Sequence, residues 1–210
     1  MSWRQAVRLA IATGALVLVA TVAQPAHAYP PTPPSASEAA NMLASLTVAP
    51  EGSLAGYDRD LFPHWITQYG SCNTREVVLR RDGTNVSVDS SCQPISGQWY
   101  SVYDAVWVGD SSDVDIDHIV ALAEAWRSGA NTWSTSRRQQ FANDLSIAQL
   151  IAVSQESNGS KGDKDPSEWL PPNQNTWCLY SREWIWVKYS YGLTVDSAEK
   201  AALQNLLGSC

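Results

Sequence analysis

Residues 113–122, "DVDIDHIVAL", alternate carboxylates with apolar residues. Asp113, Asp115 and Asp117 stand at alternate positions, and His118 follows the last of them. This alternation is typical of a β-strand. Like charges this close together repel, so two interpretations remain open. Either the strand is acidic and solvated, or a bound cation holds the carboxylates together while His118 handles a proton.

Strand geometry limits the second interpretation. In a regular strand the three aspartates share one face, and His118 points to the other face. Asp117 and His118 can serve one site only if the strand ends or bulges between them. Because "HIVALAEAW", residues 118–126, continues as a helical pattern, we expect the strand to end at this pair.

A second polar cluster is "SNGSKGDKD", residues 157–165. Asn-Gly favours a turn, so the cluster is either a polar surface turn or part of a site. The amide oxygen of Asn158 is a hard ligand that magnesium accepts, and Lys161 adds a cation one turn later. A Ser-His-Asp triad is set aside because no G-x-S-x-G motif frames a serine. The other histidine after the N-terminal segment, His64, has apolar neighbours and is expected to pack or cap.

The first residues predict export. Arg4 and Arg8 precede the apolar run 9–23, and a small-x-small sequence ends at Ala28. This is the layout of a secretory signal peptide, residues 1–28, and the run is shorter than the roughly 20 residues of a spanning helix. The chain carries 14 basic and 21 acidic residues, a formal net charge of −7. Loss of the signal removes two arginines and no acid, so a nucleic-acid partner would need a local basic patch.

Four cysteines in an exported chain predict two disulfides, for which three connectivities are possible. Pairing of neighbours in the sequence, Cys72–Cys92 and Cys178–Cys210, is our prediction. No Cys-x-x-Cys spacing occurs, which argues against a thiolate zinc site.

The order of predicted elements is mixed, and we therefore predict an α+β class. After the signal we expect a Pro/Ser-rich linker and the start of a helix at 29–45, then a single domain at 46–210. Ten tryptophans are expected mostly in the core, although exposed rows of tryptophan can bind sugars or bases. In the first half of the chain we expect a helix at 36–46 capped by Ser37, a helix at 72–83 ended by Gly83, and strands within 85–92 and 95–109. A strand at 114–120 follows, and then helices within 121–145 that are broken at 129–131. The remaining expected elements are a strand at 149–154, a polar turn-rich segment at 155–173, and helices at 177–193 and 194–210, the last starting at Asp196 or Ser197.

Several motifs in one order resemble a known family. They are "CNTREVVLRRD" (72–82), "DIDHIVALAEAWRSGA" (115–130), "RRQQFANDL" (137–145), "QLIAVSQESNGSKGDKDPSEWLPP" (149–172) and "YSREWIWVKYSYGLTVDSAEKAAL" (180–203). The chain is similar to small secreted bacterial HNH endonucleases, which are related to the nuclease domain of GmrSD-type restriction enzymes. The resemblance covers about residues 55–210.

The resemblance implies a ββα-metal (HNH, His-Me finger) core in a mostly helical domain. It assigns His118 as general base and Asp117 and Asn158 as ligands of one Mg²⁺ or Mn²⁺, with Asn158 opening the helix. Asp115 would orient the site from behind. Gln149 would replace the middle Asn of the motif, which ties the loop to the hairpin, and Asn143 is its rival. The insertion 123–146 lengthens the hairpin loop.

The function implied is a secreted, monomeric hydrolase that cleaves DNA or RNA with little sequence specificity. Lys161, Arg75 and Arg138 are the expected substrate contacts, and Arg75 is the one expected to point inward. Arg80, Arg81, Arg137 and Lys164 could extend their patch, and binding would be weak and salt-sensitive. The alternative is a secreted Trp-rich polysaccharide-binding module in which the acidic strand holds a structural calcium ion.

Overall fold

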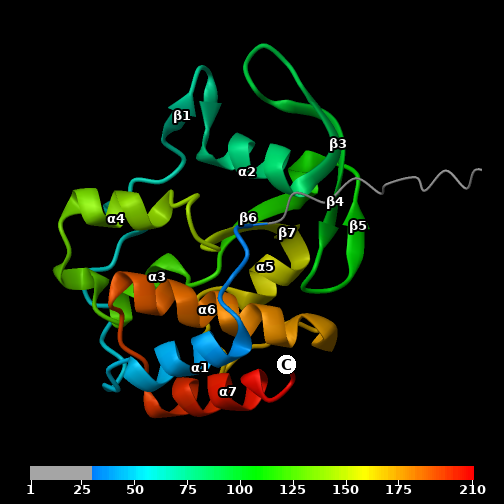
Figure 1. Ribbon diagram of the computed structural model, residues 1–210. Coiled ribbons are helices and arrows are strands. Elements are labelled where there is room, and N and C mark those ends of the chain that lie inside the picture. Colours follow the sequence, from blue (N-terminus) through cyan, green and yellow to red (C-terminus); the bar gives the residue numbers. More distant parts are fainter. Residues whose placement is uncertain (1–29) are drawn as a thin grey trace, which may run out of the picture.

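A pair of antiparallel strands lies at the centre of the computed structural model, which describes residues 30–210. Strand β6 (Val114–His118) pairs with β7 (Leu150–Ser154) (Figure 1). In the register of this pair, His118 lies opposite Leu150. Every residue of β7 is buried, as expected for a strand covered on both faces. The strand predicted around Asp117 is confirmed, and it ends at His118.

Helix α5 (Gln155–Lys161) starts directly after β7. The hydroxyl oxygen of Ser154 accepts a hydrogen bond from the backbone N–H of Ser157, which caps the helix. The residues had suggested a turn here, and this prediction is wrong because the cap and the packing of α5 on the strands override the Asn-Gly signal. Asn158 therefore lies inside the helix rather than at its first position.

A layer of three helices covers one side of the strand pair (Figure 1). These are α1 (Ala36–Ser45), α6 (Trp177–Tyr191) and α7 (Ser197–Leu207). Helix α6 supplies several fully buried core side chains, and Gly192 ends it in the left-handed conformation that glycine tolerates best. The predicted start of α7 is confirmed, with Asp196 as its cap. Helix α1 is capped by Ser35 rather than by the expected Ser37.

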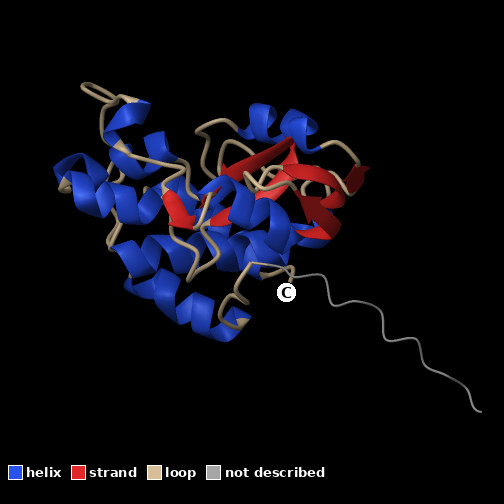
Figure 2. Ribbon diagram, turned by 90° about the horizontal axis from the view of Figure 1, so that it is seen from above, coloured by secondary structure: helices blue, strands red, loops and turns tan. Residues whose placement is uncertain are grey.

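The other side of the strand pair is covered by α2 (Thr74–Asp82) and a three-stranded antiparallel sheet. Strands β3 (Gly83–Val88), β4 (Pro94–Ser101) and β5 (Val106–Val108) form this sheet, which lies at one end of the molecule in both views (Figures 1 and 2). A second apolar cluster fills the space between the two layers. Its buried members are Val78, Leu79, Trp99, Val114, Ile116, Leu150 and Ala152.

The long connection between β6 and β7 contains two more helices, α3 (Leu122–Arg127) and α4 (Thr135–Ala142), separated near Gly129 as predicted. A two-stranded ribbon, β1 (Thr67–Tyr69) and β2 (Cys72–Asn73), precedes α2. Short 3-10 helices complete the described elements. They are Arg59–Leu61, Ser111–Asp113, Ala130–Thr132 and Gln174–Thr176.

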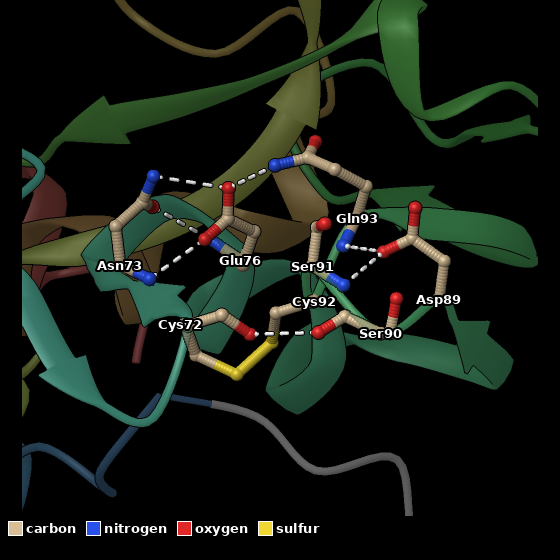
Figure 3. The surroundings of a disulfide bond; sticks show 9 residues. Cys72, Asn73, Glu76, Asp89, Ser90, Ser91, Cys92 and Gln93 are labelled. Atoms are coloured by element: carbon tan, nitrogen blue, oxygen red, sulfur yellow. Dashed lines mark hydrogen bonds between the residues drawn. A yellow bond between two sulfur atoms is a disulfide. The ribbon is translucent and has the colours of Figure 1, made fainter.

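Both disulfides are those predicted, Cys72–Cys92 and Cys178–Cys210. Figure 3 shows the first, which joins β2 to the turn between β3 and β4. Beside it, Glu76 and Asn73 cap α2 through reciprocal hydrogen bonds, and the side chain of Gln93 also donates to Glu76. This end of the molecule is therefore held by covalent and polar links together.

The class is α+β, but the expectation of a mostly helical domain is wrong, because helices make up 43% of the structure. The other described residues lie in strands and, for the larger part, in turns and irregular segments. The predicted signal peptide, residues 1–28, lies outside the described residues. Among residues 30–210, no helix has the length and hydropathy that a bilayer crossing requires.

Candidate functional site

A pocket of about 310 Å³ opens where β6 ends beside α5. Asp117 and His118 line it from the end of the strand, and Asn158 lines it from the helix. Neighbouring side chains of a strand point to opposite faces, but both can border a space at its last residues. The structure thus brings together three residues that are separated by up to 41 positions in the sequence. The lining residues are Tyr57, Arg59, Ile116, Asp117, His118, Ala121, Leu122, Ala123, Asn158, Gly159, Gly162 and Asp163.

His118 is held in one tautomer. Its side chain is 4% exposed, and Nε2 lies 3.0 Å from the carbonyl oxygen of Ala142. Because a carbonyl only accepts, Nε2 carries the proton and Nδ1 is left as the acceptor nitrogen. Burial lowers the pKa of His118 to about 3, so the ring is neutral near pH 7. A neutral imidazole with a fixed acceptor nitrogen can take a proton from a water.

Asp117 is buried and has two partners on its carboxylate. Lys161 donates to Oδ1 at 2.9 Å, and the hydroxyl of Tyr103 donates to Oδ2 at 2.7 Å. Burial raises the pKa of Asp117, and the neighbouring Lys161 ammonium acts against that rise. Lys161 and Tyr103 therefore fix the carboxylate while each oxygen keeps a further lone pair.

A hydrogen bond to Asp115 orients the side chain of Asn158, in line with the orienting role that the family resemblance implies for Asp115. Nδ2 of Asn158 donates to Oδ2 of Asp115 at 2.8 Å, from α5 to β6. This bond engages the amide nitrogen, and the amide oxygen has no hydrogen-bond partner among residues 30–210. Such an oxygen suits a hard cation, and Asn158 lines the same pocket as Asp117.

The pocket offers few ligands for a divalent ion. Within the described part of the chain, no group of three or more His, Cys, Asp or Glu side chains is arranged to hold a metal. Asp117 and Asn158 offer two hard oxygen donors, and magnesium characteristically uses one or two protein ligands together with water and phosphate. The residues therefore fit a weakly held, largely hydrated ion, whose affinity the nearby Lys161 ammonium lowers.

Gln149 and Asn143 perform different tasks. Gln149 is fully buried, and its amide accepts from the N–H of Val120 and donates to the carbonyl of Val120. It thus ties the chain after β6 to the start of β7. Asn143 instead binds the segment near Ile66 and Thr74. Neither side chain lines the pocket.

The three expected substrate contacts lie elsewhere than at the pocket. Lys161 is fully buried against Asp117 and the carbonyl of His118. Arg75 points inward as expected and donates to the carbonyls of Ser111 and Val114. Arg138 is buried and donates to the carbonyls of Leu61 and Trp133. All three act on the protein itself, because long basic side chains can satisfy backbone carbonyls that burial leaves without water.

Arg59 is the basic residue that sequence reasoning missed. It lines the pocket, is exposed, and its guanidinium forms no hydrogen bond or ion pair with the described residues. It precedes β6 by more than fifty residues, and its neighbours in "YDRDLF" are acidic or apolar. No local signal marks it, because only the path of the chain brings it to the pocket. Tyr57 reaches the pocket by the same segment.

Comparison with known proteins places the chain in a family. A fungal protein from Arthroderma benhamiae, named "Uncharacterized secreted protein", is 58% identical over 197 residues, which cover 93% of this chain and 96% of that protein. Secretion, predicted from the N-terminus, is confirmed by this relative, whereas its fungal source lends no support to a bacterial origin of the family. No solved structure matches the chain.

The family model "GmrSD restriction endonucleases, C-terminal domain" matches residues 73–206, which include β6, β7 and α5. A match of this length indicates a nuclease-type function and a nucleic-acid substrate. The chain belongs to the family of GmrSD restriction endonuclease C-terminal domains.

Proposed function

We propose that this protein is a secreted endonuclease of the HNH type that hydrolyses phosphodiester bonds in DNA or RNA with little sequence specificity. The observation that carries the proposal is the shared pocket, in which Asp117, His118 and Asn158 meet at the end of a strand pair followed by a helix. His118 is the general base, and Asp117 and Asn158 hold one Mg²⁺ or Mn²⁺.

The base step depends on Nδ1 of His118. Because Nε2 donates to Ala142, Nδ1 accepts the proton of a water as that water attacks the phosphorus. The low pKa keeps Nδ1 free of a proton at neutral pH. General-base assistance of this kind contributes roughly 10²–10⁴-fold to the rate.

Asp117 and Asn158 supply the oxygen donors, and Asp115, Lys161 and Tyr103 hold those donors in place. A divalent ion bound there supplies positive charge to the phosphate and to the departing oxygen. Two protein donors leave room for phosphate oxygens, which are the usual partners of such an ion.

Arg59 is proposed as the phosphate contact in place of the three basic residues first expected. It is free, exposed and beside Asp117 and His118 in the pocket lining. With a formal net charge of −7, the protein repels polyanions overall, so attraction must come from such local charge. No groove-reading module occurs in the described residues, which supports low sequence specificity.

The test uses the secreted chain with its disulfides intact and supercoiled plasmid DNA. We expect nicking with Mg²⁺ or Mn²⁺, none in EDTA, and recovery when the ion is restored. A protein prepared identically with His118→Ala controls for contaminating nuclease. Cleavage that continues undiminished in EDTA, or no cleavage of DNA or RNA with either ion, would refute the proposal.

The polysaccharide-binding alternative loses its main support. Of the nine tryptophans in residues 30–210, Trp107 is the one with an exposed side chain, and the others pack wholly or partly in the interior. A module that binds sugar rings would need several exposed tryptophans. Asp115 is engaged by Asn158 rather than arranged with other carboxylates around a calcium ion.

A further inference from the structure

We infer that Trp65 is a positioning residue for His118, and that Asn143 holds Trp65 in place. The inference rests on the proposed role of His118 as general base and names the residues that set the orientation of its ring. Trp65 lies 52 residues before Asp117, and it is absent from the lining of the pocket. Its effect on the reaction would therefore pass through His118.

The first observation is the contact between the two rings. The centroids of Trp65 and His118 are 5.5 Å apart, and the ring planes are inclined by 27°, which is a stacked arrangement. The ring of His64 packs edge-on against Trp65, with centroids 5.4 Å apart. A stacked indole restricts rotation of the His118 ring about its Cβ–Cγ bond. The Nε2 bond to Ala142 supplies a second restraint on the same ring.

The second observation is the backbone of Trp65, whose φ is +57°. Residues other than glycine rarely adopt this left-handed conformation, and bulky ones least of all. Residues held in such a conformation cluster at functional sites. The surrounding contacts hold it there. The backbone of Trp65 thus keeps a conformation that is unfavourable for tryptophan, and in this conformation the indole stacks on His118.

The third observation is the hydrogen bonding of Asn143, which holds the chain on both sides of Trp65. Its Nδ2 donates to the carbonyl of Pro63 at 2.8 Å, and its Oδ1 accepts from the N–H of Ile66 at 3.2 Å. Thr74 also donates to Oδ1 at 2.7 Å. These bonds fix the segment that carries Trp65.

Asn143 directly follows Ala142, whose carbonyl binds Nε2 of His118. The same short piece of chain therefore anchors the ring through Ala142 and fixes the indole that covers it through Asn143. Together the hydrogen bond to Ala142 and the stacked indole fix the orientation of the His118 ring, and therefore the direction in which Nδ1 points. Misplacement of a reacting group by about 1 Å can cost on the order of 10²-fold in rate.

A matched pair of variants tests the idea. Trp65→Phe keeps a planar ring for stacking, whereas Trp65→Leu keeps an apolar side chain without one. We expect Trp65→Leu to lower kcat on the order of 10²-fold with little change in KM, and Trp65→Phe to stay within a few-fold of the parent. Trp133→Leu is the control, because Trp133 is also partly buried and contacts Phe141 and Tyr191 but not His118.

A second readout is independent of activity. After the predicted signal the chain has two histidines, His64 and His118, so ring signals of a histidine-labelled sample are few. The stacked indole should shift the His118 ring protons upfield in the NMR spectrum. Trp65→Leu and Asn143→Ala should both remove that shift, and Trp133→Leu should leave it intact.

The outcomes separate the two proposals. If His118→Ala cleaves like the parent, the proposed base is wrong, while the NMR shift still reports whether Trp65 holds the ring. If His118→Ala is inactive but Trp65→Leu cleaves as fast as Trp133→Leu, the inference about Trp65 is overturned. Unchanged His118 ring shifts in Trp65→Leu would overturn it as well.

Discussion

The side-chain amide nitrogen of Asn158 donates to Asp115 at 2.8 Å, a bond that joins α5 to β6, and Asn158 lines the same pocket as Asp117. This relationship gives the alternate aspartates of β6 separate tasks. Asp117 faces the pocket, and Asp115 orients a second donor. The carboxylates are thus tolerated close together because each has its own partner, Asn158 for one and Lys161 for the other.

Asp115→Ala should raise the Mg²⁺ concentration needed for half-maximal cleavage by about 10–100-fold, because Asn158 loses the partner that aims it. Asp115→Asn keeps an acceptor oxygen and should show a smaller effect. The measurement is initial rate against ion concentration at saturating DNA. Equal ion dependence in the parent and in Asp115→Ala would show that the bond has no part in ion binding.

His118→Ala should lower the cleavage rate by about 10²–10⁴-fold, which is the usual contribution of a general base. Added imidazole should restore part of the rate, because it can occupy the vacated space and accept the proton. Single-turnover cleavage of plasmid DNA measures both effects. A variant that folds and cleaves at the parent rate would exclude His118 as the base.

Arg59→Ala should raise KM by about tenfold with a small change in kcat, because a charged hydrogen bond to phosphate contributes about 1.5–3 kcal/mol. The slope of log affinity against log salt should fall by about one. Arg80→Ala is the matched control, since Arg80 is exposed but does not line the pocket. The two variants should differ in fluorescence-based DNA binding, and identical behaviour would argue against a phosphate contact at Arg59.

Gln149→Ala should destabilise the protein by about 2–4 kcal/mol, because it leaves the buried N–H and carbonyl of Val120 without their side-chain partner. Gln149→Asn should destabilise the protein less than Gln149→Ala does, since its shorter amide can still reach one of the two groups. Urea unfolding followed by tryptophan fluorescence gives both values. A change below about 0.5 kcal/mol, typical of surface substitutions, would show that the tie is dispensable.

Glu183 should make stability depend on pH. This buried carboxyl on α6 has an oxygen without a hydrogen-bond partner among the described residues, and burial raises its pKa from 4.5 to about 8. Between these values the folded protein holds a proton that the unfolded chain releases. Stability therefore falls as pH rises from about 4.5 to about 8. Burial likewise raises the pKa of Glu199 to about 7, which adds to the fall.

Glu183→Gln removes this titration. When the pH rises from 5 to 8, its free energy of unfolding should therefore fall less than that of the parent, by on the order of 2–4 kcal/mol. Urea unfolding at both pH values measures the difference. Glu156→Gln, an exposed change on α5, should follow the parent. Parallel pH curves for the parent and Glu183→Gln would show that Glu183 is already paired or solvated.

Local patterns predicted most of the elements. The alternation around Asp117, the apolar run of β7, the break at Gly129 and the cap at Asp196 are all confirmed. Each depends on residues within a few positions of one another, and so their effect can be read without the fold. The local residues predicted a turn around Asn158, and only the family resemblance implied a helix there. The Asn-Gly turn preference is weaker than a Ser154 cap combined with packing on the strands.

Charged side chains were the least predictable. Lys161 and Arg138 looked like surface cations, yet both are buried against partners distant in the sequence. Arg59 looked unremarkable, yet it borders the pocket. A long basic side chain has no preferred place on its own element, since its environment depends on which carbonyls and carboxylates the fold brings within reach.

The amino-acid pattern was enough to predict the strand around Asp117, the export of the chain and the presence of two disulfides, because each depends on residues close together or on the number of cysteines. The pairing Cys72–Cys92 and Cys178–Cys210 was one of three possible connectivities, and the fold selects it. Three contacts could be found only from the folded chain: the hydrogen bond from Asn158 to Asp115, the ion pair of Lys161 with Asp117, and the stacking of Trp65 on His118. Those contacts join segments more than forty residues apart, and the free energy of burying them arises only when the whole core is assembled.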